Sequence, residues 1–216
     1  VMDELMLAVA QGLNRIPTPG EYQRIAAELA HARWLFEERG WLDDPASYHR
    51  TPPPLTEGSF VRGRTIQHPY ERMLFPSGWA PRVEEPGAER WAGYEANATA
   101  SVTLLRHRDG PRPWVVAVHG FGMGFPFMDL TGLHAVHLHR DLGLDVAIPV
   151  LPLHGPRRID RLSGEAFLGF DLVNSIHGLA QAVWDIRRLL TWIRGQGATQ
   201  IALYGVSLGG YVVALL

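Results

Sequence analysis

The chain has 216 residues, of which 46% are hydrophobic and 19% charged, with a formal net charge of −2 and no cysteine. This composition is typical of a globular protein with a sizeable core, and the charge gives no electrostatic reason to expect a nucleic-acid partner. The lack of cysteine excludes disulfides and thiolate chemistry and suits a reducing compartment. Asp3 and Glu4 stand where a signal peptide would carry Lys or Arg, and no apolar run reaches the roughly 18–20 residues that span a bilayer. We therefore expect a cytoplasmic protein without a membrane span.

Residues 1–60 are predicted to form a helical extension and a proline-rich connection. Apolar residues recur at helical spacing up to Leu13 and again over Glu21–Arg39, with a Pro-rich break between the two runs and Gly40 at the end. Residues 41–60 carry four prolines and predict an ordered surface connection. The main fold is expected to occupy residues 61–216.

The core elements follow in order along the rest of the chain. Four strands are predicted first: Arg64–His68, Tyr70–Phe75, Asn97–Leu105 and Trp114–Val118. The pattern then alternates: a helix over Leu130–Asp141, a strand over Leu144–Pro149, a helix capped by Asn174 or Ser175 that ends near Gly195, and a strand over Ile201–Tyr204. This alternation predicts an α/β fold with a doubly wound, mostly parallel sheet and right-handed crossovers.

A serine between two glycines follows the last of these strands. In Gly205-Val206-Ser207-Leu208-Gly209 the glycines permit a sharp strand-to-helix turn, in which a side chain would crowd the backbone and the serine hydroxyl is pushed out of the sheet. Such a turn also aims the N-terminus of the next helix at the hydroxyl. The backbone N–H of Leu208 is therefore a candidate donor to an oxyanion.

A second motif, His119-Gly120-Phe121-Gly122, directly follows the strand Trp114–Val118. A glycine-containing loop at the end of a buried parallel strand brings a backbone N–H close to the serine, and Phe121 is the expected donor, with Gly122 next. His119 is expected to orient this loop and not to act in catalysis.

The spacing between these two motifs resembles that of the α/β-hydrolase superfamily, over about residues 64–216. The resemblance implies an eight-stranded, mostly parallel sheet whose C-terminal part is missing here. It also implies Ser207 as nucleophile, Phe121 and Leu208 as oxyanion donors, and a catalytic acid and histidine that follow the nucleophile. Only residues 208–216 follow, without His, Asp or Glu, so we expect an inactive fragment. The continuation through Gly210-Tyr211 is similar to that of esterases, deacetylases and prolyl-oligopeptidase-like peptidases alike.

Several other residues are weaker candidates. His154, Arg157 and Arg158 follow the strand Leu144–Pro149; they are expected to stabilise a turn or remain solvated, with lining of the active site and anion binding as the alternatives. His134, His137 and His139 cannot converge on one ion from a single helix, so no metal site and no cofactor are expected. Apolar residues around the second motif either pack under the N-terminal helices or line an acyl pocket: Phe121, Met123, Phe125, Phe127 and Met128. Residues 159–170 are a candidate lid.

The expected function is therefore hydrolysis of a small-molecule carboxylic ester through an acyl-enzyme on Ser207. The alternatives are a peptidase or amidase, an acyltransferase with the same nucleophile and another acyl substrate, or a non-catalytic protein of the same fold. The sequence leaves the oligomeric state open.

Overall fold

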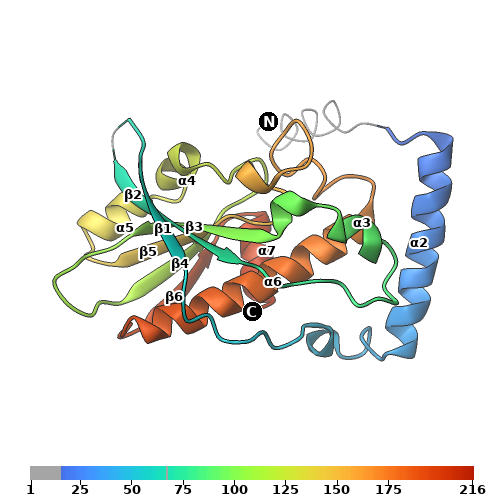
Figure 1. Cartoon of the computed structure of the whole chain (residues 1–216), viewed down its shortest axis with the longest axis horizontal. Coiled ribbons are helices and arrows are strands. Elements are labelled where there is room, and N and C mark those ends of the chain that lie inside the picture. The colour runs from blue at the N-terminus through green and yellow to red at the C-terminus, as the bar shows by residue number, and fades with distance from the viewer. Residues whose placement is uncertain (1–15, 67) are drawn as a thin grey trace.

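A computed structural model describes residues 16–66 and 68–216 and contains a six-stranded sheet flanked by helices (Figure 1). The strands are β1 (Ser59–Arg64), β2 (Pro69–Pro76), β3 (Thr99–Leu105), β4 (Trp114–Val118), β5 (Asp145–Pro149) and β6 (Ile201–Gly205). The helices are α2 (Pro19–Glu38), α3 (Ala88–Ala92), α4 (Pro126–Gly132), α5 (Ala135–Arg140), α6 (Leu172–Gly195) and α7 (Leu208–Ala214). Short 3-10 turns cover Pro45–Tyr48, Glu95–Asn97 and Gly155–Arg157.

The sheet has the strand order β1-β2-β3-β5-β4-β6. Strands β5, β4 and β6 are parallel, whereas β1, β2, β3 and β5 pair with one another in antiparallel fashion. The prediction of a mostly parallel sheet is therefore wrong for the described strands. The reason is that helical crossovers, which parallel neighbours require, begin only after β4.

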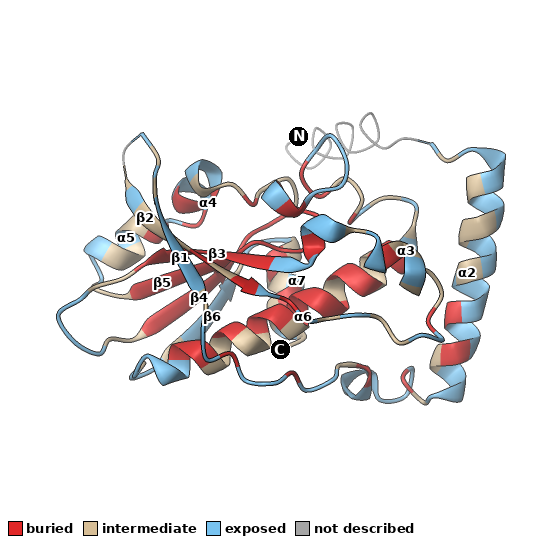
Figure 2. Cartoon of the chain, in the orientation of Figure 1, coloured by how far each residue is buried: buried red, intermediate tan, exposed pale blue. Residues whose placement is uncertain are grey.

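Helices cover both faces of the sheet, as a doubly wound fold requires. Alternate residues of a strand point to opposite faces. Val115 and Ala117 of β4 pack with α4 and α5, whereas Val116 and Val118 pack with α6 and α7. The central strands are buried throughout (Figure 2). Helix α6 contributes residues such as Leu189 and Ile193, which have no exposed surface, and burial of each stabilises the fold by about 1.5–3 kcal/mol.

One predicted helix is broken in two. Instead of a continuous helix over Leu130–Asp141, α4 and α5 meet at His134, whose φ of 51° and ψ of 29° are left-handed. Leu133 and Ala135 are both fully buried in the same core cluster. In a straight helix two such positions lie about 200° apart, so only a break lets both face the sheet.

Other boundaries also differ from the sequence predictions. The predicted strand Arg64–His68 is wrong, because β1 ends at Arg64 and the chain then turns, with the N–H of Thr65 donating to His68 O at 2.9 Å. The cap of α6 is Asp171, whose carboxylate accepts the N–H of Asn174 at 3.3 Å, and not Asn174 or Ser175. The strand Trp114–Val118 is confirmed at both ends.

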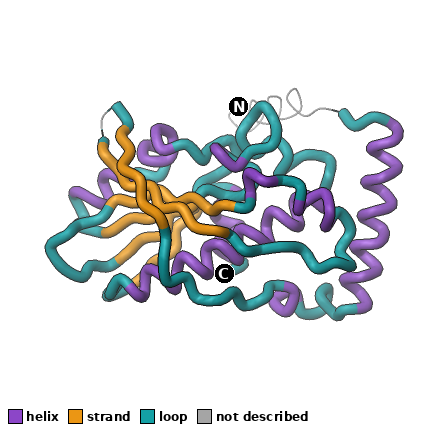
Figure 3. The backbone as a smooth tube through the Cα atoms, viewed as in Figure 1, coloured by secondary structure: helices purple, strands orange, loops and turns teal. Residues whose placement is uncertain are grey.

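Helix α2 begins with a capping box in which Thr18 Oγ1 accepts the N–H of Glu21 and Glu21 accepts the N–H of Thr18. It stands at one end of the molecule, apart from the strands (Figure 3). Leu35 anchors it in a cluster with Ala180 of α6. The helix predicted before Pro17 falls largely on residues 1–15, outside the described residues. Within the described part of the chain, no helix combines the length and apolar character needed to cross a membrane.

Candidate active site

Ser207 lies between β6 and α7, at the edge of the sheet where the parallel strands β4 and β6 end. Its φ of 53° and ψ of −119° are strained for a residue with a side chain. The turn is fixed to the neighbouring strand by the N–H of Val206, which donates to Val118 O at 3.2 Å. The side chain of Ser207 is exposed and makes no hydrogen bond with another described residue.

The two glycines of the motif are explained by close backbone contacts. A Cβ at Gly205 would lie 2.4 Å from the carbonyl carbon of Gly209, and a Cβ at Gly209 would lie 2.1 Å from Val118 O. Both distances are far below van der Waals contact. The tight packing of the start of α7 against β6 and the end of β4 therefore requires glycine at both positions.

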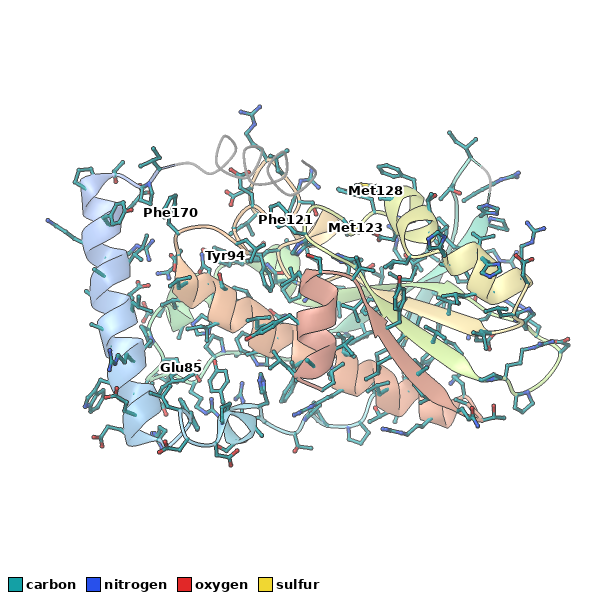
Figure 4. The ribbon with its side chains drawn as sticks, turned by 180° about the vertical axis from the view of Figure 1, so that it is seen from behind. Glu85, Tyr94, Phe121, Met123, Met128 and Phe170 are labelled. Carbon is teal, nitrogen blue, oxygen red and sulfur yellow. The ribbon has the colours of Figure 1, made fainter. Side chains whose placement is uncertain are left out.

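The loop after β4 lies directly against this turn. A Cβ at Gly120 would lie 3.2 Å from Val206 O and 3.5 Å from Ser207 Cβ, and Gly122 has a φ of 78°. The N–H of Phe121 makes no hydrogen bond with another described residue. Leu208 is the first residue of α7, so the helix leaves its N–H unpaired. Figure 4 shows Phe121 and Met123 near the N-terminal end of α7.

His119 stabilises this loop through buried hydrogen bonds. Its side chain has no exposed surface, its Nδ1 donates to Gly120 O at 2.9 Å and its Nε2 accepts the N–H of Leu151 at 3.1 Å. Burial lowers the pKa of His119 to about 3, with the neighbouring His154 ring adding to the effect. A neutral imidazole with both nitrogens engaged cannot take a proton from Ser207, and this geometry suits the loop-orienting role.

His154 is also buried and neutral. Its Nδ1 donates to Pro152 O at 2.8 Å, and its ring packs 5.1 Å from that of His119 and 6.3 Å from that of Phe121. Burial lowers its pKa to about 4. Its Nε2 has no partner among the described residues, and a Cβ at Gly164 would lie 2.3 Å from it. His154 thus packs beneath the loop, and its lowered pKa makes it a weak base.

The two arginines of the neighbouring loop have different surroundings. Arg157 is buried, pairs with Asp185 at 2.9 Å and donates to Val150 O and Asn97 O. Both expectations for Arg157, a solvated side chain and an anion-binding one, are therefore wrong. The cause is the tertiary pairing with Asp185 on α6, which no local pattern reveals. Arg158 is exposed and lies over the ring of Phe125, with 5.9 Å between the guanidinium and the centroid.

Two residues that the sequence reasoning missed support the loop after β4. Asp129 has no exposed surface, and its Oδ1 accepts the N–H of Gly124 at 2.9 Å, while Oδ2 has no partner among the described residues. Burial raises the pKa of Asp129 to about 7. Ser163 donates to Met123 O and accepts the N–H of Gly155, which ties the segment 159–170 to the loop. Asp129 and Ser163 are identified by the burial of their polar side chains, which cannot be inferred from the sequence.

The surroundings of the turn are partly apolar. Phe121 and Met123 are half-buried and Phe127 is 65% exposed, while the described N-terminal helix packs on α6 and not on this loop. The candidate lid carries exposed apolar side chains and is anchored by Phe167, which is fully buried. Between this segment and α2 lies a hollow of about 220 Å³, lined by Tyr94 and Phe170 among others (Figure 4).

No family model matches this chain. Two uncharacterized proteins of Mycobacterium tuberculosis, MT2702 and Rv2627c, are each 42% identical to it over 215 residues, which are 99% of this chain and 52% of theirs. The chain thus spans about half the length of the curated relatives it matches.

Among solved structures, the chain resembles a Bacteroides fragilis protein described as a candidate acetyl xylan esterase. The TM-score is 0.52 and the identity 14%, over 85% of this chain and 49% of that one. At this identity the likeness concerns the fold alone. It supports the α/β fold described above.

Proposed function

We propose that this protein is a serine hydrolase that cleaves carboxylic esters through an acyl-enzyme on Ser207. The observation that carries the proposal is the strained backbone of Ser207 at the carboxyl edge of the sheet, with the Gly120 loop packed against it. A residue with a side chain in this conformation costs on the order of 1–3 kcal/mol, and such strain clusters at functional sites. The fold of the Bacteroides fragilis structure adds support.

In this mechanism Ser207 Oγ attacks the carbonyl carbon of the ester while a base takes its proton, and the carbonyl oxygen of the ester becomes an oxyanion. The N–H groups of Phe121 and Leu208 stabilise the oxyanion, and each such donor contributes about 10²–10³ in kcat. The intermediate collapses to the acyl-enzyme as the alcohol leaves with a proton, and water then releases the acid.

The base and its carboxylate are proposed to come from a segment beyond the described residues. His119 and His154 are unsuitable because both are fully buried, and burial lowers their pKa values to about 3 and about 4, which makes them weak bases. Strand β6 lies at an edge of the described sheet with the apolar Leu203 and Tyr204 partly exposed. Such an edge can accept a further strand, which would bring new residues to the exposed Ser207.

The half-buried Phe121 and Met123 favour an ester with an apolar acyl group. The same nucleophile could serve a peptidase, an amidase or an acyltransferase, and a protein of this fold can also lack catalysis. Comparing hydrolysis of a p-nitrophenyl ester with that of the matching anilide separates an esterase from an amidase. Product analysis with an added alcohol separates hydrolysis from acyl transfer.

A fluorophosphonate probe tests the nucleophile in the full-length protein. The expected result is one adduct, located on Ser207 by peptide mass spectrometry and lost in Ser207→Ala. Ser47→Ala serves as a matched control, since Ser47 is an exposed serine whose hydroxyl donates to Asp44 O. A folded full-length protein that is not labelled, or that keeps its label in Ser207→Ala, would contradict the proposal.

A further inference from the structure

Two histidines and an aspartate converge at the opposite edge of the sheet from Ser207. His107 follows β3, His139 lies on α5 and Asp145 is the first residue of β5. The antiparallel pairing of Leu105 with Val146 brings the end of β3 to the start of β5. His107 and Asp145 are 38 positions apart in the sequence. Each of the three residues nevertheless offers one possible metal-ligand atom within 4.8 Å of the other two.

The hydrogen bonds of this cluster indicate which nitrogen of each ring is available to an ion. His139 Nδ1 lies 2.9 Å from Leu144 O; because a carbonyl only accepts, Nδ1 carries the hydrogen and Nε2 the lone pair. His107 Nδ1 lies 3.1 Å from Asp145 Oδ1, which also accepts the backbone N–H of His107 at 2.7 Å. An ion between Nδ1 and the carboxylate would replace the Nδ1 hydrogen, and the ring would then carry its hydrogen on Nε2. His139 has the arrangement of a metal-binding histidine, in which the second ring nitrogen donates to a carbonyl.

The two rings pack against each other beside a buried carboxylate. The centroids of His107 and His139 are 4.0 Å apart, and Asp145 is 5% exposed beside them. The nearby cation Arg112 is compensated by Asp109, whose carboxylate accepts two of its N–H groups at 2.7 and 3.2 Å.

We propose that His107, His139 and Asp145 form a binding site for a divalent zinc ion. Imidazole and carboxylate donors without thiolate suit Zn²⁺ and its first-row neighbours. In a tetrahedral zinc site the ligand atoms are about 3.4 Å apart, so ligand atoms that now lie within 4.8 Å of one another need to approach by at most about 1.4 Å. The ion ties together the connection after β3, helix α5 and the start of β5.

Solvent can reach this site through a neighbouring hollow of about 550 Å³. His139 lines it together with Arg140 and residues of the β1–β2 hairpin, including Arg62. A metal with three protein ligands keeps a fourth position for water or another ligand. The site is independent of Ser207, and the proposal stands or falls separately from the proposed ester hydrolysis.

The experiment is calorimetric titration of the full-length protein, without a histidine tag and after treatment with a chelator, with Zn²⁺. We expect one ion per chain, and at least about tenfold weaker binding in His107→Gln and His139→Gln. His137→Gln is the matched control: His137 lies on the same helix, is exposed and pairs with Asp141 at 2.7 Å, outside the cluster. It should bind as the parent protein does.

Thermal unfolding supplies a second measurement that does not depend on titration heats. Zn²⁺ should raise the Tm of the parent protein and of His137→Gln but not that of His139→Gln, and the Tm without metal shows that each variant is folded. The absence of saturable binding in the parent protein would overturn the proposal. An equal loss in His137→Gln and His139→Gln would also overturn it, because the ion would then be bound elsewhere.

Discussion

Replacement of Asp129 by asparagine should change how stability depends on pH. The carboxyl of Asp129 is buried beneath the loop after β4, and burial raises its pKa from 3.8 to about 7. Between these values the folded protein keeps a proton that the unfolded chain has released. The contribution of the protonated Asp129 carboxyl to the free energy of unfolding is therefore fully present below pH 4 and is lost as the pH rises through 7.

The size of this effect follows from the shift of pKa. A difference of about 3 units corresponds to about 4 kcal/mol over the whole range, of which about 3 kcal/mol falls between pH 5 and pH 8. His119 and His154 act in the opposite direction, because their lowered pKa values make the folded protein lose stability as the pH falls below 6.5. Both histidines are present in the variant, so their contribution cancels in the comparison.

The assay is urea unfolding of the parent protein and of Asp129→Asn at pH 5 and pH 8. Asparagine keeps an oxygen that can accept the N–H of Gly124, but it does not titrate. The variant should gain about 3 kcal/mol relative to the parent between pH 5 and pH 8, whatever its absolute stability. Asp43→Asn, which alters an exposed carboxyl after α2, should follow the parent. If the difference between Asp129→Asn and the parent is the same at both pH values, the assignment of a buried, protonated carboxyl is refuted.

Two further substitutions test the packing around the candidate site. Gly209→Ala places a Cβ 2.1 Å from Val118 O and should lower the free energy of unfolding by about 3 kcal/mol or more. Gly195→Ala is the control, because a Cβ there meets nothing within 4 Å. Equal unfolding midpoints for the two variants would show that the turn can relax. Arg157→Met leaves Asp185 buried without its cation and should cost about 3–5 kcal/mol in urea unfolding. The double variant with Asp185→Leu should recover much of this loss, and a double variant as unstable as the single one would exclude the ion pair as the cause.

The sequence by itself determined the features that depend on neighbouring residues. The glycines around Ser207, the continuous apolar run of β4 and the helical period of α6 are local patterns, and each predicts its element because backbone sterics and one-sided burial act over a few residues. These patterns also allowed the two motifs to be placed at one edge of the sheet, since parallel strands end on the same side.

Only the tertiary structure decided what depends on contacts between distant segments. The break at His134 arises because Leu133 and Ala135 must face the same sheet, and Arg157 is buried because Asp185 of α6 reaches it. The antiparallel pairing of β3 with β5 brings His107 to Asp145, which lie far apart in the sequence. Local periodicity carries no information about such pairings, because they are set by how whole elements pack.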